Sequence, residues 1–295
     1  MADPVDITAA CTLADTFKVP PSKVPGDAKA SDFDLSKLAT GASDDVDKGD
    51  AKDATDDHIK ALVELQDAFY ADGSKSILIV LQAIDAGGKD STVRRCFGGV
   101  NPQGIRVWSF KQPTDLEMDH DFLWRHHAKC PASGMIAVHN RSHYEAVLVE
   151  RVKHLVPEAK WRRRYGQINA FEQMLAAEGT IILKFFLHLS RDEQADRFRD
   201  RLERPDKWWK FSAADLDERE LWSDYQLAFR DALAATSTPA APWWAIPADN
   251  KWFRDYLITA VTLRAMRDAN PQYPQAAEGM ADQVDDFLKR LDAGR

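Results

Sequence analysis

The sequence predicts an α/β fold in which five parallel strands form a doubly wound sheet beneath a helical lid. Five apolar runs of strand length alternate with helix-like segments along the 295 residues, which is typical of a parallel sheet with right-handed crossovers. Polar residues crowd the C-terminal ends of these runs, where open α/β sheets bind ligands. A basic segment at about 190–212 is too long for a simple connection, so we expect it to fold over that edge as a lid.

Each strand is expected where an apolar run is bounded by turn residues. The five runs are 77–81, 105–110, 135–138, 180–189 and 242–247. Helices are expected at 58–70, 90–97, 115–129, 161–178, 213–236, 252–268 and 277–293, with two more ending at 155 and starting at 190. Residues 1–54 are acidic and poor in large apolar side chains, so we expect a partly ordered extension before a domain at 55–295.

Composition places the chain among soluble globular proteins, with 44% apolar and 29% charged residues. Its three cysteines show no CxxC or histidine-paired spacing, which favours a reducing compartment over a disulfide or zinc framework. We see no signal peptide and no apolar run near the ~20 residues of a membrane span. We therefore expect a cytoplasmic protein without a membrane partner.

Charge is distributed unevenly along the chain, whose net charge is −8. Residues 151–210 carry 14 Lys and Arg against 9 Asp and Glu, whereas the remainder carries 25 against 38. A basic segment in an acidic protein can focus an anionic ligand. An arginine-rich helix surface without a ligand would explain the charge equally well.

The stretch 76–92, SILIVLQAIDAGGKDST, combines the features of an anion site. An apolar run stops at Asp85, and paired glycines precede Lys89 at the start of a helix. Backbone N–H groups of such a turn, together with the lysine, are aimed at phosphate. The P-loop pattern G-x-x-x-x-G-K-[ST] would place Gly at 83 and Ser or Thr at 90, where this chain has Ala83 and Asp90. Taken alone, the turn favours phosphate binding, with a purely structural turn as the alternative.

Other charged residues fall where a ligand could be reached. Arg141 follows the third strand, and Lys184 interrupts the apolar fourth strand, where a buried anion is favoured over an edge position. Arg197, Arg201 and Arg204 are spaced to share one helix face. The histidines at 126 and 127 point about 100° apart on a helix, which favours a structural or surface role over metal binding.

These parts are those that phosphoryl transfer requires, because that reaction depends on positioning and charge neutralisation. The glycine turn would form the cradle, Lys89 would meet phosphate charge, and Asp85 would position a metal or the acceptor. An arginine finger at Arg141 or in the lid would be worth ~10³-fold or more in rate.

Several segments, taken together, resemble polyphosphate kinase family 2. They are QAIDAGGKDST, GVNPQGIRVWSFKQPT, NRSHYE, YGQINAFEQMLAAEGTIILKFFLHLS, WKFSAADL and APWWAIPADNKWFR. The resemblance covers about 55–265 and is closest to the subgroup that phosphorylates both AMP and ADP. It implies a P-loop kinase-like sheet with a helical lid, a homo-oligomer (dimer or tetramer), and transfer of the terminal phosphoryl group between inorganic polyphosphate and adenine or guanine nucleoside mono- and diphosphates. The implied cofactor is Mg²⁺, with Mn²⁺ as the alternative.

The resemblance also implies roles for particular residues. It assigns catalysis to Asp85, Lys89 and Arg141, and the metal to Asp85 and Glu145. Phosphate or nucleotide binding falls to Ala86, Gly87, Gly88, Asp90, Ser91, Thr92, Asn140 and Lys184, and polyphosphate binding by the lid to Arg197, Arg201 and Lys210. The chain departs from the family at Ala146, where relatives usually carry Asp after the Glu. Metal binding must then fall to Asp85, Glu145 or water.

Two other functions fit the same residues. One is a nucleoside monophosphate kinase that takes phosphate from ATP, and the other is a non-catalytic protein that binds polyphosphate or nucleotide. We expect no DNA or RNA partner, because the acidic bulk would repel a duplex and no reading helix is visible.

Overall fold

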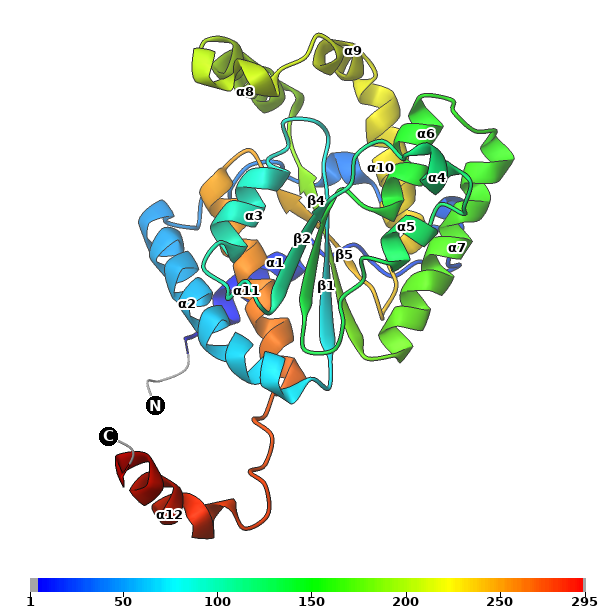
Figure 1. The fold of residues 1–295 in the computed structure, drawn as a ribbon. Coiled ribbons are helices and arrows are strands. Elements are labelled where there is room, and N and C mark those ends of the chain that lie inside the picture. The colour runs from blue at the N-terminus through cyan, green and yellow to red at the C-terminus, as the bar shows by residue number, and fades with distance from the viewer. Residues whose placement is uncertain (1–4, 294–295) are drawn as a thin grey trace.

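A five-stranded parallel sheet forms the centre of the computed structural model, which describes residues 5–293. The strand order is β2-β3-β1-β4-β5, as Figure 1 shows. The strands are β1 (Ser76–Gln82), β2 (Ile105–Ser109), β3 (Ile136–Asn140), β4 (Thr180–His188) and β5 (Trp243–Pro247). All five predicted strands and the predicted fold class are thereby confirmed.

Helices cover both faces of the sheet (Figure 1). One layer contains α2 (Lys48–Asp72), α3 (Lys89–Phe97) and α11 (Lys251–Ala269), and the other contains α6 (Val149–Val152), α7 (Glu158–Ala177) and α10 (Trp222–Thr236). Every residue of the central strand β1 is buried. A strand covered on both faces needs an unbroken apolar run, which explains the run of five large aliphatic residues at 77–81.

The N-terminal segment packs on this domain. Helix α1 (Thr8–Asp15) lies against α11, and the N–H of Val19 donates to the carbonyl of Trp243 at 2.8 Å. Two short 3₁₀ turns follow, η1 (Ala28–Ala30) and η2 (Leu35–Lys37). The predicted boundary at 54/55 falls inside α2, whose N-terminus is capped by Asp47. The segment buries apolar residues of its own, among them Ala14, Val19 and Leu35, and two backbone bonds join it to the edge strand β5.

Three predicted helices are broken into shorter pieces. The prediction at 115–129 becomes α4 (Asp115–Met118) and α5 (Trp124–His127), and that at 213–236 becomes α9 (Ala214–Glu220) and α10. The helix expected to end at 155 is a 3₁₀ turn, η3 (His143–Ala146), followed by α6. Between α4 and α5, Asp121 accepts a bond from the N–H of Leu123 at 2.9 Å. Such local side-chain bonds compete with a continuous helix.

The basic segment after β4 forms the expected helical cover. It contains α8 (Arg191–Leu202), η4 (Pro205–Lys210) and α9, which lie beyond the C-terminal end of β4 in Figure 1. We refer to residues 191–220 as the lid. Because α8 ends at Leu202, Arg204 lies past the helix, and its predicted place on one face with Arg197 and Arg201 is wrong.

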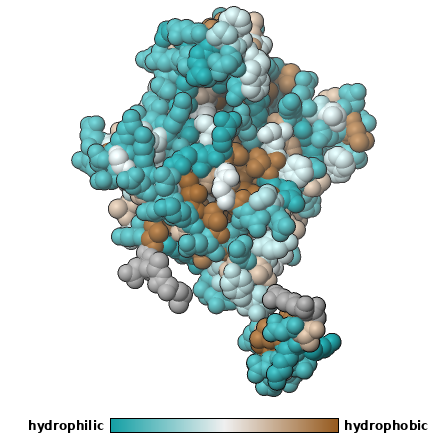
Figure 2. All heavy atoms as spheres, turned by 60° about the vertical axis from the view of Figure 1, so that its left-hand side comes forward, coloured by the Kyte–Doolittle hydropathy of each residue, from teal (hydrophilic) through white to brown (hydrophobic). Residues whose placement is uncertain are grey.

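The last helix, α12 (Met280–Ala293), stands apart from the rest of the molecule (Figures 1 and 2). A linker after α11 connects it to the domain. None of the helices within residues 5–293 combines the length and apolar character that crossing a membrane requires.

Candidate active site

The loop between β1 and α3 is tight enough to require its glycines. A Cβ at Gly87 would lie 2.4 Å from the Cβ of Ala83, and Gly88 has φ of +97°. Ala86 also has positive φ, at 61°, a conformation that costs a non-glycine residue of order 1 kcal/mol or more. The loop ends at the N-terminus of α3, where free N–H groups favour an anion.

Lys89 lies in this loop without a direct carboxylate partner among the described residues. Its Nζ donates to the carbonyl oxygens of Ala83 at 2.8 Å and Ile84 at 3.4 Å. Burial, reinforced by the positive charge of Arg141, lowers the pKa of Lys89 to about 8. The ammonium is therefore held in place by neutral acceptors, and a bound anion would stabilise its charged form.

Adjacent strand ends bring Asp85 and Arg141 together. β1 and β3 are paired neighbours, with Leu81 opposite Asn140, so the residues that follow them meet at one edge of the sheet. The Arg141 guanidinium donates to the Asp85 carboxylate at 2.8 Å. Arg141 has φ of 62°, which is uncommon for this residue type and is often found at functional sites.

Two further predicted residues lie at the same edge. The Asn140 amide donates to Asp90 at 2.6 Å and so connects the end of β3 to the start of α3. Glu145 lies on η3, and burial raises the pKa of its carboxyl although Arg141 and Lys89 oppose the shift. Glu145 therefore lies close enough to Arg141 and Lys89 to feel both positive charges.

The Asp85 and Glu145 carboxylates suit a divalent ion whose remaining ligands come from water and substrate. No group of three or more His, Cys, Asp or Glu in residues 5–293 could hold a metal by itself. Mg²⁺ is usually held by one or two carboxylates together with water and substrate phosphates. Asp85 and Glu145 meet that requirement, whereas a site made of protein ligands alone is not present in that part of the chain.

The lid is bonded directly to the loop. Gln194 donates to the carbonyl of Asp85 at 2.9 Å. Arg197 is only 9% exposed and donates to the carbonyls of Ala86 at 3.0 Å and Ala248 at 2.5 Å. Arg197 therefore holds the lid against the loop, and its binding of polyphosphate stays a prediction.

Sequence reasoning missed Arg254, which also contacts the loop. Arg254 is 1% exposed, and its guanidinium donates to the Ser91 hydroxyl at 3.3 Å and the Gly88 carbonyl at 3.5 Å. Its other nitrogens bond to Asp255. Its only sequence signal was its place in NKWFR after the fifth strand, where polar residues again follow an apolar run.

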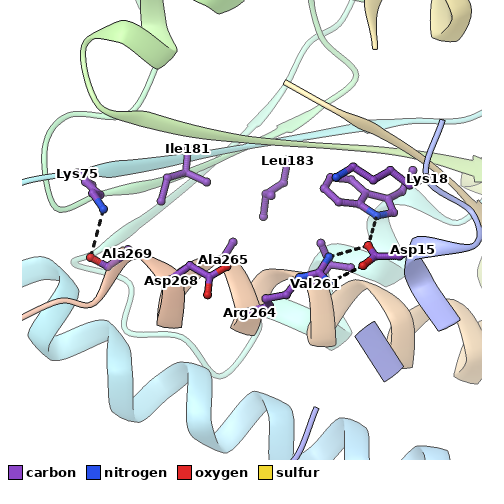
Figure 3. Close-up of a pocket in the computed structure, with 11 residues that line it drawn as sticks. Asp15, Lys18, Lys75, Ile181, Leu183, Val261, Arg264, Ala265, Asp268 and Ala269 are labelled. Atoms are coloured by element: carbon purple, nitrogen blue, oxygen red, sulfur yellow. Dashed lines mark hydrogen bonds and ion pairs between the residues drawn. The ribbon is translucent and has the colours of Figure 1, made fainter. Parts of the chain in front are cut away.

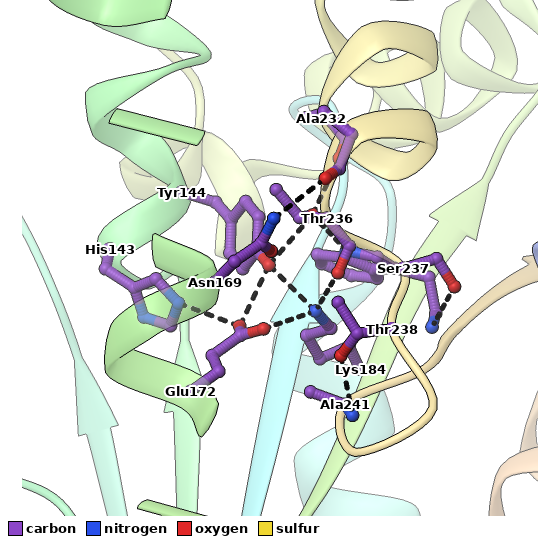
Figure 4. Close-up of polar contacts among 12 residues, drawn as sticks. His143, Tyr144, Asn169, Glu172, Lys184, Ala232, Thr236, Ser237, Thr238 and Ala241 are labelled. Atoms are coloured by element: carbon purple, nitrogen blue, oxygen red, sulfur yellow. Dashed lines mark hydrogen bonds and ion pairs between the residues drawn. The ribbon is translucent and has the colours of Figure 1, made fainter. Parts of the chain in front are cut away.

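Two of the residues predicted to bind phosphate are fully buried and bonded to other protein groups. Thr92 is 0% exposed, and its hydroxyl donates to the Gly88 carbonyl at 3.1 Å. Lys184 is also 0% exposed, and its Nζ donates to Glu172 at 2.6 Å, to the Tyr144 hydroxyl and to the Thr236 carbonyl (Figure 4). Both side chains are therefore bonded within the protein, and their binding of phosphate stays a prediction, whereas the expectation of a buried anion beside Lys184 is confirmed by Glu172.

The remaining predicted residues lie on the lid or beside the loop. Arg201 donates to the carbonyl of Lys210 at 3.4 Å, and the exposed Lys210 ammonium lies over the Trp209 ring at 4.7 Å. Within residues 5–293 neither side chain forms a hydrogen bond or ion pair with the loop. Ala146 is buried, with its carbonyl accepting a bond from Arg164 at 2.7 Å, so Glu145 is the acid that η3 offers to the site.

A glycine loop at a helix N-terminus, a lysine, an acid–arginine pair from adjacent strand ends and a bonded lid define a phosphotransferase of the P-loop kinase type. The family model of polyphosphate kinase 2 matches residues 45–274. The chain therefore belongs to the polyphosphate kinase 2 family.

Similar proteins agree with this assignment. The AMP/ADP-polyphosphate phosphotransferase of Meiothermus ruber is 51% identical over 216 residues, which is 73% of this chain and 81% of that protein. The ADP-polyphosphate phosphotransferase of Rhodopseudomonas palustris is 44% identical over 229 residues, or 74% and 79% of the two chains. Polyphosphate kinase 2 from Arthrobacter aurescens TC1 superposes with a TM-score of 0.87 at 36% identity, covering 94% of this chain and 96% of the other.

Proposed function

We propose that this protein transfers the terminal phosphoryl group of inorganic polyphosphate to AMP and ADP, and in the reverse direction from nucleotide to polyphosphate. The observation that supports it is the cluster of Lys89, Asp85 and Arg141 around the glycine loop, beneath a lid bonded to that loop. The 51% identity to a protein named for both AMP and ADP favours this pair of acceptors.

Each residue has a distinct task in this proposal. Lys89 and the N–H groups of Gly88–Asp90 hold the transferred phosphoryl group, and Arg141 neutralises charge that develops on it. Asp85 keeps Arg141 in place and, with Glu145, would hold Mg²⁺ or Mn²⁺, which supplies further charge neutralisation on the phosphates. The acceptor phosphate is already ionised, so the site needs no strong base.

The lid would bind the part of the polyphosphate chain beyond the transferred phosphoryl group. In this proposal Arg201 of α8 and Lys210 of η4 bind the chain, and Arg197 fixes the lid to the loop. We expect the protein to act in the cytoplasm as a homo-oligomer. The net charge of −8 supports the expectation that it binds neither DNA nor RNA.

Product formation without ATP tests the proposal. The purified protein is incubated with AMP, polyphosphate and Mg²⁺, and ADP followed by ATP is expected. A kinase that takes phosphate from ATP would form no ADP under these conditions, which would contradict the proposal. Binding of polyphosphate without any product across a Mg²⁺ series would indicate a non-catalytic binding protein. Replacing AMP by ADP, GMP or GDP then ranks the acceptors.

A further inference from the structure

The last residue of the central strand β1 is a buried glutamine. Gln82 is 1% exposed and follows five buried aliphatic residues. Its Nε2 donates to the Ser142 hydroxyl at 3.1 Å, whereas its Oε1 has no hydrogen-bond partner in residues 5–293. An unpaired amide oxygen in the interior costs free energy that an apolar side chain of the same length would avoid. Packing alone therefore does not explain a glutamine at this position.

Gln82 bonds to both ends of the turn that carries Glu145. Ser142 is the N-cap of η3, and its hydroxyl also accepts from the N–H of Tyr144 at 3.3 Å. Burial raises the pKa of the Glu145 carboxyl, and a hydrogen bond from the Gln82 side chain is among the contacts that oppose this shift. One buried amide of β1 thus contacts both the residue that caps the turn and the acid that the turn carries.

Glu145 can reach a ligand, whereas Gln82 cannot. The Glu145 side chain is partly exposed, but that of Gln82 is almost completely enclosed. Because its neighbour Ala146 carries no charge, Glu145 is the one acid of η3, and its orientation depends on contacts of its own. Carboxylates that bind metal ions are usually oriented by hydrogen bonds from neighbouring side chains, and loss of such a bond weakens ion binding.

The two ends of β1 differ in what they offer a ligand. Before its start, Lys75 donates to the Ala269 carbonyl at 3.3 Å, and Arg264, which lines the same cavity, pairs with Asp15 (Figure 3). These charged groups are bonded within the chain. At the other end, the Gln82 amide donates to a partly exposed acid. This bond lies at the edge of the sheet that carries the glycine loop.

We propose that Gln82 is a positioning residue that holds Glu145 in the orientation in which it binds the divalent ion. This role rests on the proposed function, in which Asp85 and Glu145 are the protein ligands of that ion. Gln82 acts through Glu145 and contacts neither ion nor substrate. Its replacement therefore weakens ion binding but not nucleotide binding at saturating ion.

Mn²⁺ binding by Gln82→Met tests this role, because methionine fills a similar space without an amide. Mn²⁺ is titrated into protein with AMP and without polyphosphate, so that no phosphoryl donor is present. Free Mn²⁺ is measured by electron paramagnetic resonance against a blank without protein. The Kd for Mn²⁺ should rise roughly 10-fold or more. In the transfer assay the half-saturating Mg²⁺ concentration should rise similarly, with KM for AMP at saturating Mg²⁺ unchanged.

Gln66→Met is the matched control. Gln66 is also 1% exposed, but it accepts from the N–H of Asn101 at 2.7 Å and donates to the Asn101 carbonyl at 3.0 Å, before the start of β2. Gln66→Met removes two satisfied bonds, so it should lower the melting temperature more than Gln82→Met does and still bind Mn²⁺ as tightly as the wild type. Equal losses of Mn²⁺ affinity in the two variants would show a general effect of stability and overturn the proposal.

Ser142→Ala tests the same bond from its other end and is the smaller change, so it decides the question if Gln82→Met does not fold. It should weaken Mn²⁺ binding several-fold. Wild-type affinity in Gln82→Met, or in Ser142→Ala where that variant alone folds, would overturn the proposal, as would a wild type that binds no Mn²⁺. Failure of the proposed function looks different, because the wild type would then form no ADP from AMP and polyphosphate whatever its affinity for Mn²⁺.

Discussion

At the scale of single residues, the proposed reaction depends on the charge of Lys89. Lys89→Ala should abolish phosphoryl transfer from polyphosphate to ADP, since the Lys89 ammonium is the cation proposed to hold the transferred phosphoryl group, and the protein gives it only neutral carbonyl partners. The fold should survive, because Lys89 is only partly buried and burial of its charge is unfavourable. Product formation and the melting temperature measure the two effects.

The control for this variant is Lys52→Ala, which removes an exposed lysine from α2. It should leave both turnover and melting temperature unchanged. Turnover of Lys89→Ala close to that of the wild type would rule out the proposed role of the lysine.

The pKa of Lys89 gives a second prediction at this scale. In the free enzyme that pKa lies near 8, lowered from 10.5 mainly by burial, so kcat/KM for polyphosphate should fall as pH rises through about 8. The free energy of unfolding should instead rise with pH over the same range. Between pH 8 and 10.5 the unfolded chain retains a proton that the folded chain has lost, so this group adds to stability as pH rises.

Comparison with Lys89→Met isolates this contribution from other titrating lysines. Methionine at position 89 does not titrate. Between pH 7.5 and 9.5 the melting temperature of the wild type should therefore rise relative to that of Lys89→Met. A difference that stays constant, together with a flat kcat/KM profile for the wild type, would contradict the lowered pKa.

The site residues could be predicted from the sequence where their place in the chain fixes their position in the fold. Gly87, Gly88 and Lys89 are consecutive, and Arg141 directly follows a strand, so parallel pairing alone brings them to one edge. Lys184 and Arg254 could not be assigned in this way. Whether a charged side chain within a strand or helix meets ligand or protein depends on which neighbours pack against it, and those neighbours come from distant parts of the chain.

At the scale of elements, the lid depends on a buried arginine. Arg197 donates to the carbonyls of Ala86, Ala248 and Asp249. Removing it leaves buried acceptors without donors, so Arg197→Ala should lower the free energy of unfolding by about 1–3 kcal/mol and reduce turnover. Denaturant unfolding and product formation measure these effects.

Arg199→Ala is the matched variant, because Arg199 is on the same helix but exposed, and its bond is to Asp196. It should change the free energy of unfolding by less than about 0.5 kcal/mol. If the two variants lose the same stability and turnover, the bonds seen from Arg197 do not hold the lid to the loop.

Helices and strands were predicted well where their own sequence pattern defines them, and poorly where contacts with distant residues do. All five strands follow from apolar runs that needed no knowledge of their partners. The ordered N-terminal segment did not follow, since Val19 and Leu35 are buried by contacts with the rest of the domain rather than by any periodic pattern of their own. The breaks within 115–129 and 213–236 depend on local bonds that periodicity does not report.

At the scale of the whole molecule, one buried polar network joins the layers of the fold. Lys184 of β4 pairs with Glu172 of α7, which also accepts from Tyr144 of η3 and bonds His143. Lys184 further donates to the Thr236 carbonyl of α10. Figure 4 shows these side chains meeting in one cluster. His143 and Tyr144 belong to η3, the turn that carries Glu145, so the network couples the stability of the fold to the position of a proposed metal ligand.

Breaking this network from one side should cost more than removing the ion pair altogether. Lys184→Met leaves a buried carboxylate without its cation, for which a loss of about 3–5 kcal/mol in the free energy of unfolding is expected. Lys184→Met combined with Glu172→Gln removes both charges, so its loss should be clearly smaller than the sum of the two single losses. The exposed pair of Arg162 and Glu158 provides the control, with a coupling of about 0.3–0.5 kcal/mol. Additive losses at Lys184 and Glu172 would show that the two residues stabilise the fold independently, and the central pair of the network would then not join β4 to α7.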